Sequence, residues 1–264
     1  MKKYWLVAKN TWDETVTYRF NFVMWRVRTI LQLLTVYFLW LAVIPKDGSF
    51  GTYSQSLMLT YIFGTQILFS FVFASRSYSV GDEINLGNLS NFLIRPINYF
   101  AYWFAKDLGD KAMNIVFATG ELTLLFLILK PPLFIQKELP FILFFILAVI
   151  LAIFMYFFFN FLLGLIAFWS PEVWAPRFIF YVLINFVSGG LFPLDVLPSA
   201  IFEKLIFLPF TYMLYFPLKI YLGQLSTSQI LSGMAIASVW TIVFYLIVKL
   251  VWQAGLKVYT SQGR

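Results

Sequence analysis

The acidic residues are the side chains of this sequence that could carry acid–base chemistry, because the chain contains no His and no Cys. Those two absences exclude a Ser-His-Asp triad, a thiolate nucleophile and a structural zinc site. Asp107 and Asp110 stand three residues apart, so on a helix their carboxylates share a face and could act as acid and base. Metal-dependent carboxylate chemistry usually needs a denser acidic cluster, and a solvated helix turn is the simpler interpretation. The sequence predicts no catalytic residue, no metal site and no cofactor on this chain.

A second set of polar residues lies inside long apolar stretches, namely Gln66, Glu121, Asn185 and Ser188. An ionisable or polar group at such a position is costly in a membrane, which makes it a functional candidate. These four residues are therefore candidates for a substrate pathway. Interhelical hydrogen bonding, worth roughly 0.6–2 kcal/mol per residue, is the alternative, and we favour it for Asn160. For Glu121 a hydrogen-bonded structural role is the main alternative.

Composition places these polar residues in a membrane protein. Of the 264 residues, 61% are hydrophobic and 12% are charged, where soluble domains carry about 25% charged residues. Such a chain lacks the polar surface of a soluble globule, which excludes an ordinary cytosolic domain, a disordered chain and a disulfide scaffold. The net charge of +7 is spread over several segments, so it indicates membrane topology and no nucleic-acid partner.

Segments without charged residues locate the spans, because a charge at mid-bilayer costs about 2.5–3.5 kcal/mol and a crossing takes about 20 residues. Glu121 interrupts the third segment, and snorkelling of Arg26 and Arg28 lets the first begin near Met24. The fold class is therefore an all-α integral membrane protein, one transmembrane domain over residues 1–264 with six transmembrane helices. The predicted spans are 24–45, 56–75, 112–129, 141–169, 175–192 and 232–252.

The positive-inside rule orients these spans. Lys and Arg concentrate before the first span, between the second and third, and after the sixth. Both termini, including Arg264, are therefore expected in the cytoplasm. A seventh span at 205–222 would move Lys249, Lys257 and Arg264 to the outside, against this rule.

Residues 1–20 predict a helix that lies in the membrane interface and contacts lipids. Its basic and acidic residues are Lys2, Lys3, Lys9 and Asp13. The opposite side, at helical spacing, carries Tyr4, Trp5, Ala8, Trp12 and Val16. The alternative is a plain lead-in to the first span.

Residues 76–111 are expected to form the one sizeable cytoplasmic loop. Gly87 can end one helix, Asn88 can cap the next, and Pro96 ends that helix. The result is a helix of about two turns that presents Leu89, Phe92 and Leu93. So short a helix does not hold itself together in water, so it docks either on a partner or on the ends of this chain's own spans.

Glycine and proline interrupt the apolar segment 192–231 on the outer side. Because irregular backbone at membrane depth must be buried in protein or line a cavity, we expect a helical hairpin that re-enters the bilayer without crossing it. Its marker residues are Gly190, Pro193, Pro198, Pro209 and Pro217.

The loop and the outer segment together resemble the permease subunits of type-2 ATP-binding-cassette (ABC) exporters. In that family a Glu-x-x-x-Gly-x-Leu-x-x-x-Leu-x-x-Pro pattern follows the second span. The matching residues here are Glu83, Gly87, Leu89, Leu93 and Pro96, while Asn88 and Asn91 replace the family's usual Thr and Glu. The sequences Arg95-Pro96-Ile97-Asn98 and Gly190-Leu191-Phe192-Pro193-Leu194 are similar to a subgroup of largely uncharacterised permeases, some of which are linked to drug or peptide export.

The resemblance implies the roles of these segments. The 83–96 segment would be a coupling helix seated in a cleft of a separate ABC ATPase, which binds ATP and Mg, and the outer hairpin would cap the exit. A second permease, identical or homologous, would complete a dimer in the bacterial cytoplasmic membrane. The coupling residues would be Glu83, Gly87, Asn88, Leu89, Phe92, Leu93, Arg95 and Pro96.

The chain itself shows no phosphate-binding loop. The nearest candidate, from Gly81 to Gly87, has five intervening residues and no Lys after it, so this chain is expected to be a transport subunit and not an ATPase. Two other function classes stay open, a membrane-embedded lipid-modifying enzyme and a non-catalytic membrane assembly protein.

Overall fold

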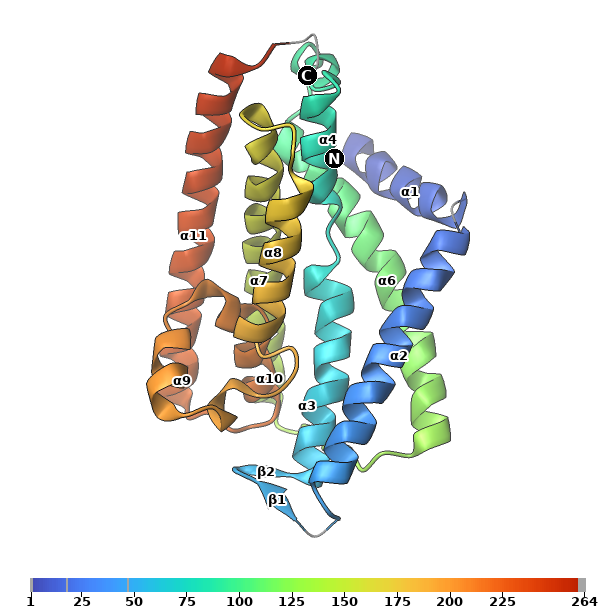
Figure 1. Cartoon of the computed structure of the whole chain (residues 1–264), viewed down its shortest axis with the longest axis vertical. Helices are drawn as coiled ribbons and strands as arrows, with labels where there is room; N and C mark the ends of the chain where they lie inside the picture. The colour runs from blue at the N-terminus through green and yellow to red at the C-terminus, as the bar shows by residue number, and fades with distance from the viewer. Residues whose placement is uncertain (1, 18, 47, 261–264) are drawn as a thin grey trace.

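The protein is a helical bundle with one two-stranded hairpin, described by a computed structural model for residues 2–17, 19–46 and 48–260 (Figure 1). The side chain of Val16 and residue Arg264, which enter the predictions above, lie outside this description. The N-terminal elements are α1 (Lys2–Thr17), α2 (Arg19–Val43), β1 (Ser49–Phe50), β2 (Tyr53–Ser54), α3 (Gln55–Leu68), η1 (Phe69–Phe73), η2 (Arg76–Ser79), α4 (Val80–Asn85) and α5 (Ser90–Leu93). The C-terminal elements are α6 (Tyr99–Leu129), α7 (Leu139–Leu165), η3 (Ile166–Phe168), α8 (Trp174–Val187), η4 (Leu194–Val196), α9 (Ser199–Leu205), η5 (Pro209–Met213), α10 (Tyr215–Tyr221) and α11 (Thr227–Val258).

Five segments of the described chain are long and apolar enough to cross a membrane, which identifies a multi-pass membrane protein. They are Val23–Val43, Gln55–Asn85, Tyr99–Leu129, Leu139–Phe168 and Thr227–Val258. The predicted fifth span, 175–192, forms only the 14-residue helix α8. At 1.5 Å per residue such a helix is about 21 Å long, less than the roughly 30 Å of a hydrocarbon core. Six complete crossings therefore stay a prediction.

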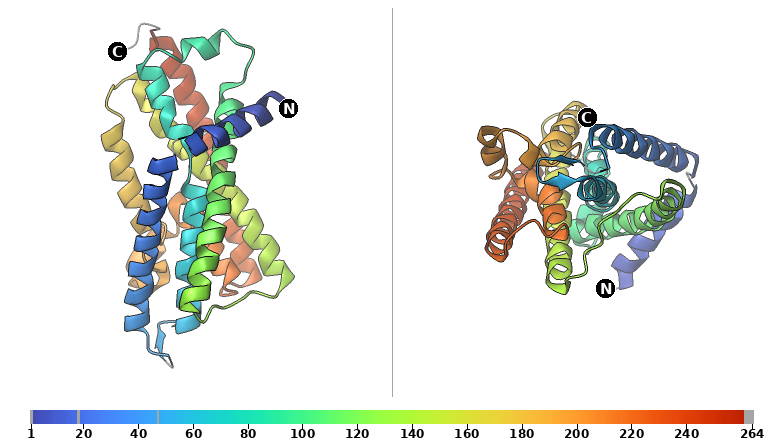
Figure 2. Two further views of the ribbon diagram at one scale, coloured as in Figure 1. Left: turned by 90° about the vertical axis from the view of Figure 1, so that its right-hand side faces the viewer. Right: turned by 90° about the horizontal axis from the view of Figure 1, so that it is seen from below.

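The start of α1, the end of α11 and the segment 86–98 lie at one end of the molecule, here named the loop end (Figures 1 and 2). The hairpin of β1 and β2 lies at the opposite end, with Phe50 paired to Tyr53. Helix α1 leaves the line of the bundle and lies across α6 (Figure 2). This arrangement is compatible with an interfacial helix, and its place relative to lipid stays a prediction.

The predicted loop 76–111 is mostly helical. Residues 76–85 are helical, and α6 begins at Tyr99, well before the predicted span start at residue 112. The charges that suggested exposure are paired inside the protein: the side chains of Asp107 and Lys111 are 0% and 3% exposed and form an ion pair. Because each of these two charges has a partner of opposite sign, a charged residue does not by itself end an apolar segment here, and the bounds of the third span stay a prediction.

The outer segment is broken, as expected from its prolines. Pro198 precedes α9, Pro209 begins η5, and α10 has only seven residues. No helix here approaches the 18 residues of the proposed seventh span at 205–222, and this whole stretch is described. Whether the segment enters the bilayer stays a prediction.

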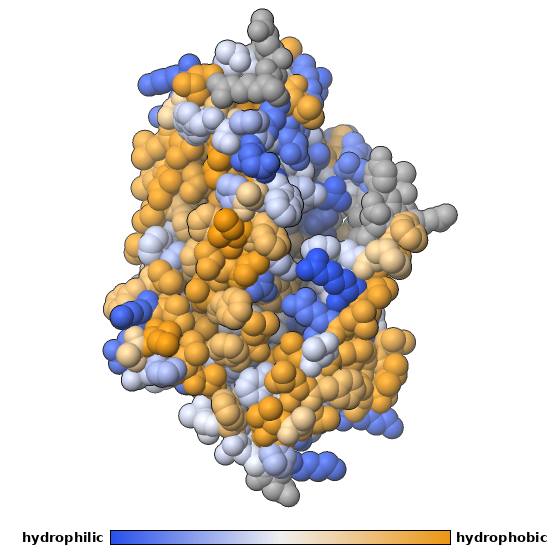
Figure 3. Space-filling view, viewed as in Figure 1, coloured by the Kyte–Doolittle hydropathy of each residue, from blue (hydrophilic) through white to orange (hydrophobic). Residues whose placement is uncertain are grey.

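Two apolar clusters hold the bundle together. The larger one joins α2, α3, α7, α10 and α11, and the smaller one lies at the loop end around Trp103, Phe161 and Phe168. Much of the visible surface is also apolar, as expected for helices that face lipid, while hydrophilic residues gather near the loop end and in a hollow beside the α2 side of the bundle (Figure 3).

Candidate functional site

A cavity of about 600 Å³ opens among α2, η1, α6, α7 and α8, within the size range of small-molecule sites. Its polar wall includes Arg26, Gln66, Arg76, Asp110, Asn114, Asn160 and Arg177. Its aromatic wall consists of Trp25, Phe69, Phe73, Tyr78, Tyr156 and Tyr181. A wall of this mixture suits a molecule with a ring or chain and one or two polar groups.

An ion pair between α2 and α6 lies beside this cavity. Arg26 Nε donates to Glu121 Oε1 at 2.6 Å, and a second guanidinium nitrogen donates to Oε2. The side chains are 6% and 18% exposed. The predicted snorkelling of Arg26 is therefore wrong, because the guanidinium reaches across to a carboxylate on the neighbouring helix and is neutralised there. Glu121 lies behind Arg26 and does not line the cavity itself.

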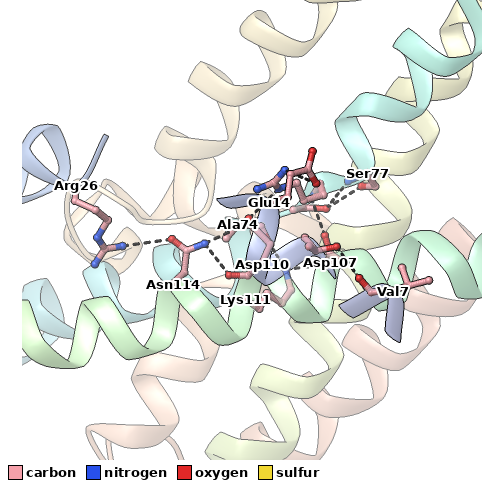
Figure 4. A network of polar contacts seen from close by, with 12 residues as sticks. Val7, Glu14, Arg26, Ala74, Ser77, Asp107, Asp110, Lys111 and Asn114 are labelled. Carbon is pink, nitrogen blue, oxygen red and sulfur yellow. Dashed lines mark hydrogen bonds and ion pairs between the residues drawn. The ribbon is translucent and has the colours of Figure 1, made fainter. Parts of the chain in front are cut away.

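A chain of polar contacts continues from this pair toward the loop end (Figure 4). Arg26 donates to Asn114 at 3.4 Å, and the Asn114 amide donates to the Asp110 carboxylate at 3.2 Å. Asp110 in turn accepts from Arg76 at 2.9 Å, and Arg76 lies 3.8 Å from the Glu14 carboxylate. The network thus ties α1, α2, α6 and η2 together along one wall of the cavity.

Asp107 and Asp110 are not the solvated helix turn expected from the sequence. Asp107 is fully buried, accepts from the Arg76 backbone N–H at 2.9 Å and pairs with Lys111 at 2.9 Å. Lys111 also donates to the Ala74 carbonyl where the backbone leaves η1. Both carboxylates are therefore held by cations, and the described residues contain no group of three or more potential metal ligands.

Arg177 differs from the other charged residues of the cavity. Arg26, Arg76, Glu14 and Asp110 all belong to ion pairs, whereas no ion pair of Arg177 is found within the described residues. Its guanidinium donates to the Tyr78 carbonyl, and its buried Nε has no hydrogen-bond partner there. The Arg177 guanidinium therefore lies outside the ion pairs of the described residues, although the Asp82 carboxylate is close enough to act on it electrostatically.

Of the remaining predicted pathway residues, one lines the cavity and two do not. Gln66 lines the cavity, as does Asn160, which also donates to Ser77 at 3.1 Å. Asn185 donates to the Tyr181 carbonyl of its own helix, and Ser188 is buried outside the cavity. Three cavity residues were not recognised from the sequence, namely Arg26, Asn114 and Arg177. The presence of Glu121 in an apolar span was the signal that a cation on a neighbouring span should face it.

The segment between α4 and α6 agrees with its prediction at Gly87 and differs from it at Asn88 and Leu89. Helix α5 has four residues and no side-chain cap, so Asn88 is not a capping residue. Gly87 adopts a φ of +75°, which a glycine tolerates best. Leu89, expected to be exposed, is buried in the smaller apolar cluster, because the turn at Gly87 directs the chain back over α6 and η3.

The predicted coupling residues form an anchored loop with an exposed tip. Glu83 accepts from the Tyr99 hydroxyl at 2.7 Å, and Phe92 packs against Tyr99 and Tyr102. Arg95 and Pro96 are exposed. The large apolar side chains that remain exposed are Leu86, Leu93 and Ile94, at 70%, 48% and 83%. This set, named the loop patch, replaces the predicted set of Leu89, Phe92 and Leu93.

The predicted outer markers surround a buried polar cluster. Lys219, two residues after Pro217, donates to Asp195, Tyr53 and Gln224 at 2.7, 3.1 and 2.6 Å. Tyr53 donates to the other oxygen of Asp195 at 2.9 Å. Burial lowers the pKa of the Lys219 ammonium, and Asp195 opposes that shift. The cluster ties α10 to β2 and to the turn after Pro193.

A close backbone approach explains one of the outer glycines. A side chain at Gly190 would meet the Asn185 carbonyl at 2.9 Å and the Phe69 ring at 3.0 Å. The turn after α8 therefore packs directly on η1, one of the cavity walls. The marker residues thus belong to a compact unit at the edge of the bundle.

The fold and this site define a multi-pass helical membrane protein with a polar cavity inside its bundle. The chain matches the family described as ABC-2 family transporter protein over residues 30–263, and it belongs to that family. A search of curated proteins finds no match. The family is a membrane component of ABC transport and not a catalyst by itself, which confirms the resemblance at this level.

Proposed function

We propose that this chain is the transmembrane subunit of an ATP-driven ABC exporter, coupled through residues 83–96 to a separate ATPase that binds ATP and Mg. The observation that carries the proposal is the loop patch, which stands at the end of a bundle belonging to the ABC-2 transporter family. Apolar surface stabilises a complex by about 25 cal/mol for each Å² removed from water. Leu86, Leu93 and Ile94 therefore favour a protein partner over solvent.

The charges around the patch would orient that partner. Glu83 is held by Tyr99 at the base of the loop, and Arg95 is exposed beside Ile94. Rim charges set orientation and association rate more than affinity. The ATPase would therefore seat its cleft on the loop patch, with Arg95 at the edge.

The transport pathway would include the cavity beside Arg26 and Gln66. Its open side lies toward α2 and α8, whose exposed apolar side chains include Phe178 and Leu183. A second permease, identical or homologous, would close this side, and the 192–231 segment would cap the outer exit. The supporting observation is that polar groups line the cavity while the outward helix faces are apolar.

The charge of the cavity suggests the substrate class. Arg177 forms no ion pair with the described residues, and six aromatic rings surround the same space. An amphiphile with a carboxylate or phosphate group would satisfy both features. A cationic amphiphile would meet a guanidinium of its own sign, so we expect weaker binding for it.

The test replaces Ile94 by Asp and measures recovery of the ATPase and its substrate-stimulated hydrolysis. The ATPase is first identified by co-purification with the native chain from mild detergent and is then co-expressed with each variant. A charge in the centre of an apolar interface should weaken binding by about 2 kcal/mol, roughly 30-fold. Ile135→Asp is the matched control, because Ile135 is 68% exposed and lies outside the loop.

The outcomes separate the function classes. Loss of ATPase recovery with Ile94→Asp and normal recovery with Ile135→Asp would support the coupling loop. Equal recovery with both variants would contradict it. A native chain that binds no ATPase would favour the non-catalytic assembly protein.

A further inference from the structure

The coupling loop is too short to hold its own shape. Between the end of α4 and the start of α6 its only helix is α5, with four residues, and one helical turn is unstable alone. Its position must therefore come from contacts with other elements. The side chain of Leu89 anchors the loop in the smaller apolar cluster. Hydrogen bonds from side chains of α1 and from Tyr259, just after α11, hold the backbone of the loop.

Tyr259, directly after α11, makes a paired contact with this backbone. Its hydroxyl donates to the Gly87 carbonyl at 2.8 Å and accepts from the Ser90 N–H at 3.2 Å. The two bonded groups flank the turn at which Gly87 adopts a positive φ. The same two backbone groups also bond to each other at 3.3 Å, and the Ser90 hydroxyl donates to the Gly87 carbonyl at 2.7 Å. The Tyr259 hydroxyl thus adds a bridge between a donor and an acceptor of the turn, which fixes its own orientation.

The α1 side of the loop is held more loosely. Lys3 donates to the Pro96 carbonyl at 3.0 Å, and the Asn98 N–H donates to the Tyr4 hydroxyl at 3.3 Å, both at exposed positions. Bonds that compete with water contribute little. The end of α11 is therefore the stronger of the two attachments.

The C-terminal part of α11, just before Tyr259, is packed closely against neighbouring elements. Trp252 stacks on Tyr99 at 5.0 Å, and a side chain at Gly255 would meet the Phe168 ring at 2.0 Å. The Tyr259 ring also contacts Phe168 edge-on at 6.0 Å. Because close-packed interiors resist compression, a displacement of the loop would be passed to the helix.

The other end of α11 packs on the outer segment. Trp240 Nε1 donates to the Phe207 carbonyl just after α9 at 3.1 Å. A side chain at Gly233 would meet the Phe216 ring of α10 at 2.2 Å. The helix has 32 residues, which gives it a length of about 48 Å. It thus connects the loop end of the molecule with the 192–231 segment.

We propose that Tyr259 is a positioning residue that attaches the coupling loop to α11, and that α11 carries movement of the loop to the outer segment. The proposal rests on the proposed function, since it assigns the loop to an ATPase. The ATPase would displace the loop patch, Tyr259 would transfer the displacement to α11, and Trp240 would deliver it to the segment that follows α9.

The experiment uses the complete transporter complex with Tyr259→Phe, which removes the hydroxyl and keeps the ring. Tyr245→Phe is the control, because Tyr245 lies on the same helix and its hydroxyl makes no hydrogen bond to a described residue. The first readout is hydrogen exchange at the Ser90 amide. Because the Ser90 N–H keeps the Gly87 carbonyl as a second acceptor at 3.3 Å, its exchange should accelerate by roughly 2-fold, the lower limit for the loss of one neutral hydrogen bond. The second readout is the ratio of substrate-stimulated to basal ATP hydrolysis, which should fall while ATPase recovery stays unchanged.

Trp240→Phe tests the other end of the same helix. It should lower the hydrolysis ratio with Ser90 exchange at the wild-type level, because the inner contact is intact. A normal ratio in either variant would overturn transmission through α11, and unchanged Ser90 exchange in Tyr259→Phe would overturn the contact itself. Absence of any ATPase from the native complex would instead refute the proposed function, a result that the Ile94→Asp comparison detects separately.

Discussion

Replacing Glu121 by Gln should destabilise the bundle by leaving Arg26 as an unpaired charge. The guanidinium is 6% exposed and makes two hydrogen bonds to this carboxylate. Removing one partner of a buried ion pair costs about 3–5 kcal/mol. Because Glu121 is 18% exposed and Arg26 keeps its bond to Asn114, we expect the lower limit of about 3 kcal/mol.

The assay is thermal unfolding in detergent, followed by the fluorescence of the nine Trp residues at one fixed scan rate. At roughly 2–4 °C per kcal/mol, the variant should unfold about 6–12 °C below the native protein. Glu203→Gln is the matched control, since this exposed acid forms no ion pair with the described residues. Its unfolding temperature should change by no more than about 2 °C.

The double variant Arg26→Met/Glu121→Leu distinguishes an unpaired charge from a general packing defect. Replacing a whole buried pair by apolar residues is often neutral or stabilising, so this variant should unfold near the native temperature. If the double variant were as unstable as Glu121→Gln, or if Glu121→Gln unfolded with the native protein, the ion-pair explanation would be refuted.

Three further predictions concern other parts of the molecule. Gly109→Ala should lower the unfolding temperature, because its Cβ would meet the Ala8 carbonyl oxygen of α1 at 2.4 Å. The control is Gly120→Ala on the same helix, whose Cβ meets nothing within 4 Å and which should stabilise the protein by about 0.5–1 kcal/mol. Equal changes in unfolding temperature would contradict the docking of α1 on α6. Burial and Asp195 raise the pKa of the Tyr53 hydroxyl, so the folded state keeps a proton that the unfolded state releases near pH 10, and stability should fall as the pH rises above this value. In thermal melts between pH 9 and 11, Tyr53→Phe should reduce this loss of stability by up to about 1.4 kcal/mol per pH unit. If the stability of the native protein and of the variant fell in parallel with pH, the raised pKa of Tyr53 would be refuted. Gly87→Ala should strain the turn by about 1–2 kcal/mol, because Gly87 adopts a positive φ, and should weaken binding of the ATPase. An unchanged affinity for the ATPase in a binding titration would disprove this prediction.

The long apolar helices could be predicted from the sequence because charge is expensive in a bilayer. The same rule did not predict that helix α6 begins at Tyr99, before the charged residues Asp107 and Lys111, which form an ion pair inside the protein. It also misread Arg26, whose carboxylate partner lies on another helix, 95 positions away in the sequence. A rule based on single residues does not contain pairings between helices.

The candidate site was predictable in part. The pattern that begins at Glu83 predicted a turn-rich loop between α4 and α6, which we propose as the coupling loop, since glycine and proline fix local turns. It did not predict which side chains the loop exposes: Leu89 turns inward while Leu86 and Ile94 remain outside. That choice depends on how the turn at Gly87 packs over Tyr99 and Phe168, which is a tertiary contact. Gln66 was recognised by its polarity, whereas Arg177 was attributed to the topology signal alone.

The most direct test of the central claim measures ATP hydrolysis by the purified complex and by this chain after its partner has been removed. We expect the complex to hydrolyse ATP through a second polypeptide that carries a phosphate-binding loop. We expect no hydrolysis by the isolated chain, because no such loop occurs in its sequence. Hydrolysis by the isolated chain with contaminants excluded, or a native complex without any ATPase, would contradict it.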